Sequence, residues 1–279
     1  MPKHLEVRAA FEVENMKFFA MRGRSAKDAL VMAAMVAASV LITAAQANHA
    51  EMRPEHKLDV LPAQQPAIST NELLAPHKAQ AAAQQAREDL DRRRYPEAKK
   101  HIEQALEIYP NYALALQLRG LIKLREDHLE EACADFQQAI QSDPNLGAAY
   151  IALGAAYNRL GQFQEAISPL SRAVTVLPKA WTAHYESALA YLGTGKYEAA
   201  LQAISRAVEN NPDGPENRSS VFYTKGRVLL ALKDYPAAKA AFEQSINEGP
   251  KGHFAKLSEK SLEHLNAHSD GQELSASRK

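Results

Sequence analysis

Two histidines, His264 and His268, stand four residues apart near the C-terminal end of the sequence. On a helix this spacing places both imidazoles on one face, where they could bind a metal ion together. A third ligand is missing, because at about 1.5 Å per residue His253 would lie about 16 Å from His264 along the helix axis. Glu263 points to a different face. We therefore interpret the two histidines as an exposed pair and expect no metal and no other cofactor.

The other reactive side chains form no catalytic pattern. Cys133 is the single cysteine, has no plausible histidine partner, and is predicted to be a buried, inert thiol. The sequence contains no G-x-S-x-G, no P-loop and no G-x-G-x-x-G motif. Carboxylates are plentiful, but they fall where the solvated surfaces of helices are expected. These observations predict that the protein is not an enzyme.

A fixed period organises the elements that carry these residues. Five prolines follow one another at steps of 34, 34, 34 and 38 residues: Pro110, Pro144, Pro178, Pro212 and Pro250. Such a period indicates stacked repeats, which usually bind partners. The clearest copy reads Tyr150-x-x-Leu153-Gly154-x-x-Tyr157 and continues with Ala166, Leu170, Ala173 and Pro178.

This pattern resembles the tetratricopeptide repeat. The resemblance implies an all-α fold, an α-solenoid of five helix-turn-helix repeats (77–110, 111–144, 145–178, 179–212 and 213–250) with a C-terminal capping helix at 251–268. Small residues such as Gly154 should let the two helices of a repeat approach closely, and the closing proline should stop the second helix. Pro169, inside a second helix, predicts a bend there.

Two copies depart from the pattern. The first repeat is the weakest, since Asp89 stands where Tyr157 stands in the clearest copy, as expected of a terminal repeat. In the fifth repeat, four extra residues are expected to lengthen the loop at 213–218. Outside the repeats, residues 48–76 are predicted to be a disordered linker and residues 269–279 a disordered polar tail.

The N-terminal residues 1–47 read as an extension followed by a signal peptide. Residues 29–45 carry no charge, basic residues precede them, and Ala45-Gln46-Ala47 follows them as an A-x-A site. Cleavage after Ala47 and a periplasmic or secreted location are therefore expected. The alternative is an uncleaved anchor that tethers the protein to the inner membrane, facing the periplasm. Acidic residues before Met21 suggest that translation begins at Met21 or Met16.

Charge narrows the class of partner. The formal net charge is zero, with 33 basic and 33 acidic residues. A nucleic-acid partner normally calls for a basic face, so none is expected. Membrane contact is expected only through the N-terminal segment, if it is not cleaved.

The resemblance also implies a binding surface. In this family the first helix of each repeat lines a concave groove, and positions spaced four and then three apart usually meet the partner. Most of the corresponding side chains here are apolar or aromatic: Gln117, Leu121, Leu124, Ile151, Ala155, Asn158, Tyr185, Leu189, Leu192, Tyr223, Arg227 and Leu230. Gln117, Leu121 and Ala155 depart from the clamp that holds acidic peptides, so the implied ligand is an apolar or aromatic peptide or helix.

The predicted function is thus a non-catalytic adaptor or scaffold in the bacterial envelope, with a protein or peptide partner. Three alternatives stay open. The groove side chains could pack between repeats or be covered by the N-terminal linker. The protein could associate with itself into a homo-oligomer through the groove or the exposed end of the first repeat. It could also be an accessory or metal-binding subunit of an envelope enzyme, centred on His264 and His268.

Overall fold

The computed structural model describes residues 70–210 and 212–276, with side chains described as far as Asn266. The chain divides into two compact units, Met1–Arg53 and Pro54–Lys279, and every described residue belongs to the second. The predicted signal peptide, its cleavage site and the linker up to residue 69 lie outside the described residues. Among the helices that are described, none is long and apolar enough to cross a membrane.

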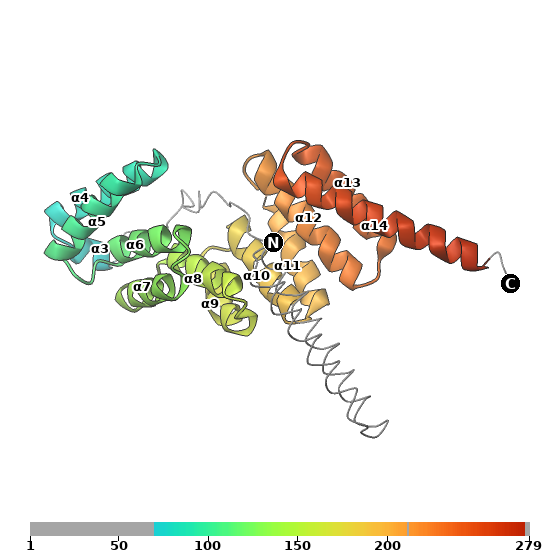
Figure 1. Cartoon of the computed structure of the whole chain (residues 1–279). Coiled ribbons are helices and arrows are strands. Elements are labelled where there is room, and N and C mark those ends of the chain that lie inside the picture. Colours follow the sequence, from blue (N-terminus) through green and yellow to red (C-terminus); the bar gives the residue numbers. More distant parts are fainter. Residues whose placement is uncertain (1–69, 211, 277–279) are drawn as a thin grey trace, which may run out of the picture. The chain divides into compact units, whose positions relative to one another are not determined.

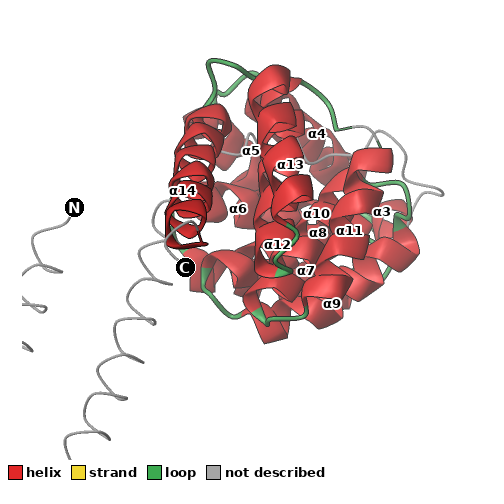
Figure 2. Cartoon of the chain, turned by 90° about the vertical axis from the view of Figure 1, so that its right-hand side faces the viewer, coloured by secondary structure: helices red, strands yellow, loops and turns green. Residues whose placement is uncertain are grey.

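The described part of the second unit consists of helices joined by short loops (Figure 2). A short helix, α3 (Thr70–Leu74), precedes five helix pairs, and one long helix, α14 (His253–Ala276), follows them (Figure 1). The pairs are α4 (His77–Asp91) with α5 (Tyr95–Ile108), α6 (Ala113–Arg125) with α7 (Leu129–Ser142), α8 (Gly147–Arg159) with α9 (Phe163–Val176), α10 (Trp181–Gly193) with α11 (Tyr197–Glu209), and α12 (Pro215–Ala231) with α13 (Tyr235–Glu248). Each pair contacts the next, which confirms the predicted α-solenoid.

The turn inside each pair repeats one backbone motif. One residue per turn has a positive φ between 57° and 75°: Arg93, Asp127, Gly161, Gly195 and Lys233. The N–H of the following residue donates to a carbonyl five residues back, as from Arg94 to Asp89 and from Gln162 to Tyr157. This is the Schellman motif, which ends an α-helix by satisfying its last carbonyl groups. It turns the chain at the same place in all five repeats.

The turn between pairs depends on the periodic prolines. In four of these turns, the residue just before the proline accepts a hydrogen bond at its carbonyl. The donor is the N–H of the second residue after the proline, as from Tyr112 to Tyr109 and from Ala180 to Leu177. Proline fits the second position of such a β-turn because its φ is already fixed near the required value. The prolines therefore begin a turn just after the second helix ends, in agreement with their predicted role.

Small residues on the first helices accept large side chains from the second helices. A Cβ added at Gly154 would lie less than 3.0 Å from Leu170, and the same holds for Gly120 against Phe136. Gly226 and Phe242 form the equivalent contact in the fifth repeat. The sequence prediction that these glycines allow the helices of one repeat to approach is confirmed.

The first and last segments of the described chain differ from their predictions. The predicted linker ends earlier than residue 76, because α3 begins at Thr70 and Asn71 is buried there. Its side chain donates to the carbonyl of Asn111 and accepts from the N–H of Ala113, which fixes α3 against the second repeat. At the other end, α14 continues beyond the predicted limit at His268 to Ala276, so much of the predicted polar tail is helical.

The four extra residues of the fifth repeat are not in a loop. They extend α12, which has 17 residues where α6, α8 and α10 have 13 each. Pro215 lies at the start of this helix, where its missing N–H costs nothing. Arg218 then pairs with Glu248 of α13 at 2.7 Å. The prediction of a lengthened loop at 213–218 is therefore wrong. Helix α9 runs through Pro169 without interruption, and the bend expected there stays a prediction.

Helix α14 covers the last repeat. It contacts both α12 and α13, as α10 contacts both α8 and α9 two repeats earlier. Phe254, Ala255 and Ser258 are buried, and the rings of Phe254 and Tyr223 lie 5.7 Å apart. Helix α14 thus occupies the place of a further first helix, and the predicted capping role is confirmed.

Candidate partner-binding surface

The first helices of the pairs form one layer of the repeat unit. Each contacts the first helix of the next repeat, and the contact between α8 and α10 is the most extensive. Among the described helices, no two second helices contact each other to the same extent. Neighbouring repeats are therefore closest together on the side of the first helices, the side on which the groove was predicted.

The predicted groove residues divide into two groups by burial. Those on α6 and α8 are buried, as is one residue on α10: Gln117, Leu121, Leu124, Ile151, Ala155, Asn158 and Tyr185. Those on the remainder of α10 and on α12 are partly or fully exposed: Leu189, Leu192, Tyr223, Arg227 and Leu230. Whether any of them binds a partner stays a prediction.

The buried group contributes to the core. Leu121 and Leu124 belong to a cluster that also contains Phe136, so they pack between α6 and its neighbours. Tyr185 packs with Ile204 and Val221, and only 3 % of its surface is exposed. Replacing these residues would test the stability of the repeats and not a surface contact.

The exposed group lies on the last two repeats. Leu192 and Leu230 occupy equivalent positions, 38 residues apart, near the C-terminal ends of α10 and α12. Leu230 is one of the few large apolar side chains classed as exposed in the described part of the chain. The Arg227 guanidinium lies 5.9 Å from the centre of the Tyr223 ring. The whole exposed group presents apolar groups and one cation to solvent. We call it the α10–α12 surface: Leu189, Leu192, Tyr223, Arg227 and Leu230.

A polar contact joins α8 to α10 beside this surface. The Asn158 amide nitrogen donates to the backbone carbonyl and to the carboxylate of Glu186, each at 2.9 Å. Burial raises the pKa of the Glu186 carboxyl to about 7, against the opposing effects of the Asn158 hydrogen bond and the Arg159 charge. The sequence analysis named Asn158 and missed Glu186. Glu186 lies three residues before the predicted groove residue Leu189, and residues at this spacing share a helix face. This spacing was the signal that could have identified Glu186.

Arg159, next to Asn158, is committed to the preceding repeat. Its guanidinium donates to the carbonyl of Leu124 at 2.5 Å and to the Asp127 carboxylate at 2.8 Å. It therefore acts on Glu186 at longer range and does not form an ion pair with it.

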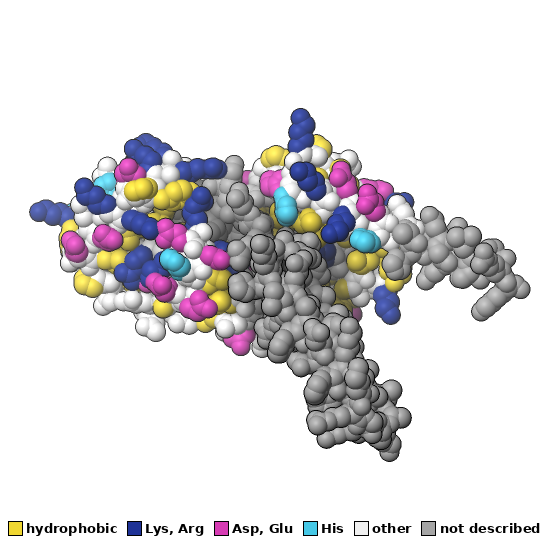
Figure 3. Space-filling view, in the orientation of Figure 1, with side chains coloured by type: hydrophobic (Ala, Val, Ile, Leu, Met, Phe, Trp, Pro, Cys, Tyr) yellow, Lys and Arg dark blue, Asp and Glu magenta, His cyan; other side chains and the backbone are white. Residues whose placement is uncertain are grey.

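The charged side chains at the start of the repeats are engaged with one another. A cleft of about 300 Å³ between the first two repeats is lined by acidic and basic residues together. Within it Lys99 pairs with Glu126, while Arg119 and Lys123 both pair with Asp135. Figure 3 shows the same mixture of positive and negative side chains over the visible face of the described residues. The cleft and the visible face of the described residues therefore carry charges of both signs.

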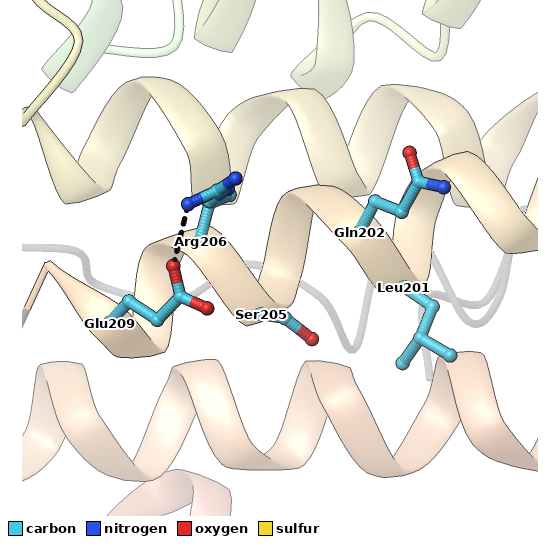
Figure 4. Close-up of a pocket in the computed structure, with 5 residues that line it drawn as sticks. All are labelled: Leu201, Gln202, Ser205, Arg206 and Glu209. Atoms are coloured by element: carbon cyan, nitrogen blue, oxygen red, sulfur yellow. Dashed lines mark hydrogen bonds and ion pairs between the residues drawn. The ribbon is translucent and has the colours of Figure 1, made fainter.

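A second cleft, of about 360 Å³, lies along α11 (Figure 4). Its lining comes from one helix: Leu201, Gln202, Ser205, Arg206 and Glu209. Arg206 and Glu209 pair with each other at 3.0 Å.

The structure describes two of the candidates for chemistry, Cys133 and His264. Cys133 is buried as predicted, and burial raises the pKa of its thiol to about 11, which keeps it protonated. His264 is exposed on α14, and the side chain of His268 lies outside the described ones. Within the residues that the structure describes, no three metal-binding side chains cluster together. What the arrangement offers is a surface for binding.

Comparison with known families agrees with the helix pairs. The tetratricopeptide repeat profile matches residues 83–147, 118–177 and 151–215, and a second profile of the same description matches residues 219–248. The chain belongs to the tetratricopeptide repeat family. No curated protein matches the chain significantly.

Solved structures of tetratricopeptide repeat proteins are similar in fold. MamA from Desulfovibrio magneticus RS-1 is 22% identical, with a TM-score of 0.53 over 62% of this chain and 96% of that one. PilF of Pseudomonas aeruginosa is 19% identical, with a TM-score of 0.55 over 68% and 90%. YrrB, described as a TPR protein with an unusual peptide-binding site, is 19% identical, with a TM-score of 0.52 over 67% and 99%. At these identities the similarity establishes the fold alone.

Proposed function

We propose that this protein is a non-catalytic adaptor that binds an apolar or aromatic peptide or helix of a partner protein on the α10–α12 surface. The tetratricopeptide repeat fold supports a role in protein interaction. The observation that carries the location is the accessibility of Leu192 and Leu230 at equivalent positions of adjacent repeats, whereas the corresponding residue of α6, Leu124, is buried.

Apolar surface gives the expected driving force. Covering it releases about 25 cal/mol per Å², and Leu189, Leu192 and Leu230 would be covered by one bound segment. The aromatic ring of Tyr223 is partly exposed, and its contacts with Phe242 and Phe254 hold it in place. The peptide-binding site named for YrrB is a property of that protein, and it supports the idea that a repeat stack of this size can hold a peptide.

We propose further that the adaptor acts in the bacterial envelope after export. The support is the basic, apolar and A-x-A sequence that ends at Ala47. N-terminal sequencing of the protein from a fractionated bacterial host should find Asn48 as the first residue. An intact N-terminus in the membrane fraction would instead identify an anchor.

The binding proposal is tested by charge on the exposed leucines. A variant with Leu192→Glu and Leu230→Glu should fold normally, because both side chains are accessible, and should lose the partner, because binding would have to desolvate two carboxylates. Partners captured by the wild-type protein are identified by mass spectrometry, and their dissociation constants are then measured with purified components.

The matched control is Tyr235→Glu. Tyr235 is 53% exposed at the start of the second helix α13, so this variant makes a similar change away from the proposed surface. It should bind as the wild-type protein does. If the wild-type protein, the Leu192→Glu, Leu230→Glu variant and the Tyr235→Glu variant bound the partner equally well, the binding site would lie outside the α10–α12 surface.

A second candidate function, self-association, is supported by two exposed leucines on α3, at the N-terminal end of the described repeat stack. Leu73 and Leu74 on α3 are 67% and 70% exposed, the highest values among the large apolar side chains described. Contact between two such ends would bury them. Light scattering after size exclusion should then show a dimer that a Leu73→Ser, Leu74→Ser variant abolishes.

A further inference from the structure

The Glu186 carboxylate lies in a partly buried position without a cationic partner. Among the described residues it forms no ion pair, and it accepts one side-chain hydrogen bond, from Asn158. A carboxylate removed from water is stable in its charged form when a cation or several donors contact it. Burial raises the pKa of this carboxyl to about 7, and the one hydrogen bond from Asn158 and the Arg159 charge only partly offset that effect.

A second acceptor without a partner lies beside it. The Asn158 side chain is 5% exposed, and its amide oxygen Oδ1 has no hydrogen-bond partner. This oxygen belongs to the same amide group whose nitrogen lies 2.9 Å from Glu186 Oε2, so the two acceptors are neighbours. Buried polar atoms are rarely left unpaired in native proteins, and here both atoms need a donor.

The protein's own nearby cation does not supply that donor. Arg159 is held by the Leu124 carbonyl and the Asp127 carboxylate of the preceding repeat. Moving it to Glu186 would break both contacts. The contacts that the repeats already make therefore leave Asn158 Oδ1 without a donor and Glu186 with one side-chain donor.

The position of Glu186 indicates where the donor enters. Leu189 follows it by three residues on α10, so the two side chains are neighbours on one helix face. Glu186 is partly exposed on this side. A segment bound along the α10–α12 surface would pass beside the carboxylate.

We propose that the bound peptide inserts a Lys or Arg side chain between α8 and α10, where its N–H groups donate to the Glu186 carboxylate and to Asn158 Oδ1. Lys offers three donors and Arg five, and neither has an acceptor that would oppose the two oxygens. The site thus selects a peptide in which a basic residue neighbours apolar ones. This inference rests on the proposed function and adds the chemistry of one subsite.

Four peptide libraries test the subsite. Each contains capped nonapeptides with Leu, Phe, Tyr and Ser randomised at eight positions, and the libraries differ only at the central residue, which is Lys, Arg, norleucine or Glu. The wild-type protein should retain the Lys and Arg libraries about tenfold more than the norleucine library, because a charge-assisted hydrogen bond to a desolvated carboxylate stabilises by about that factor. The Glu library should be retained least.

The decisive variant is Glu186→Gln, which keeps an oxygen for Asn158 and removes the charge. Its retention of Lys and norleucine libraries should become equal, with its melting transition at least as high as that of the wild-type protein. Glu198→Gln, on an exposed residue of α11, is the matched control and should keep the tenfold preference. A preference that survives in Glu186→Gln, or disappears in Glu198→Gln, would overturn the subsite.

The outcomes also separate this inference from the proposed function. If the wild-type protein retains all four libraries equally and Leu192→Glu, Leu230→Glu abolishes retention, the surface binds peptides and the basic subsite is refuted. If the wild-type protein retains none of them, both proposals fail.

Discussion

Asp89 occupies the position in the first repeat that Tyr157 occupies in the third, and its contacts explain the exchange. The Asp89 carboxylate is buried and is bonded by His101 and Arg94 of its own repeat. Tyr157 instead accepts a hydrogen bond from Gln137 of the repeat before it. A first repeat has no such predecessor. The sequence predicted a degenerate end repeat, but the period alone could not predict the polar contacts that replace the tyrosine.

The contact of Gly154 with Leu170 is expected to be sensitive to one methyl group. Gly154→Ala should lower the free energy of unfolding by about 1 to 3 kcal/mol, because the added Cβ overlaps the leucine. In the double variant with Leu170→Ala, the new methyl group has space. The free energy of unfolding lost by the double variant should therefore be smaller than the sum of the losses in the two single variants. Urea unfolding of the four proteins measures this. Strict additivity would show that the two helices move apart freely.

Glu186 should give the protein a characteristic pH dependence. Its pKa is about 7 when folded, above its ordinary value of 4.5, so the folded protein keeps a proton that the unfolded chain has lost between these pH values. The free energy of unfolding should therefore fall as pH rises from 4.5 to 7, by up to about 3 kcal/mol from this group. Glu186→Gln should remove that part of the slope in denaturant unfolding at several pH values. If the free energy of unfolding changed with pH in the same way in the wild-type protein and in Glu186→Gln, Glu186 would not be the source of this pH dependence.

Single helices and turns were predicted well where a residue type has one strong conformational preference. The periodic prolines predicted the turns between repeats, and Pro96 and Pro236 lie at the starts of α5 and α13, where a missing N–H costs nothing. The extension of α12 was missed, although Gly214 followed by Pro215 is itself a helix-start signal. Residue type alone did not predict which residues adopt the left-handed conformation in the turns. Arg93 and Lys233 have a positive φ in their turns, as Gly161 and Gly195 have in theirs.

Lys233 should be replaceable by glycine with a gain in stability. Its φ is 63°, a conformation that costs a residue with a Cβ about 1 kcal/mol or more, and its side chain is exposed. Lys233→Gly should therefore raise the free energy of unfolding by about 1 kcal/mol in urea. The complementary change, Gly161→Ala at φ 75°, should lower it by a similar amount. A destabilised Lys233→Gly variant would mean that the lysine makes a contact that outweighs the strain.

Across the whole repeat unit, the sequence predicted which helix face would line a groove but not how much of it would be accessible. Ile151 and Leu189 are both apolar residues at predicted groove positions, yet Ile151 is buried and Leu189 is partly exposed. Accessibility depends on how closely neighbouring first helices approach, a tertiary quantity that no single repeat encodes. Glu186 was missed for a related reason, since its partner Asn158 lies 28 residues away on another helix.

The stability of the whole repeat unit should depend on α14. Truncation before Gly252 would uncover Tyr223, Leu229 and Phe242, which pack with or beside this helix, and at about 25 cal/mol per Å² should cost several kcal/mol. A lower melting midpoint and aggregation are expected, measured by circular dichroism and light scattering. Truncation after Asn266 is the control, because it keeps Phe254 and the other buried contacts of α14 and should melt as the full chain does. If the protein truncated before Gly252 remained monomeric with an unchanged melting midpoint, α14 would be dispensable for the core and free to contact a partner instead.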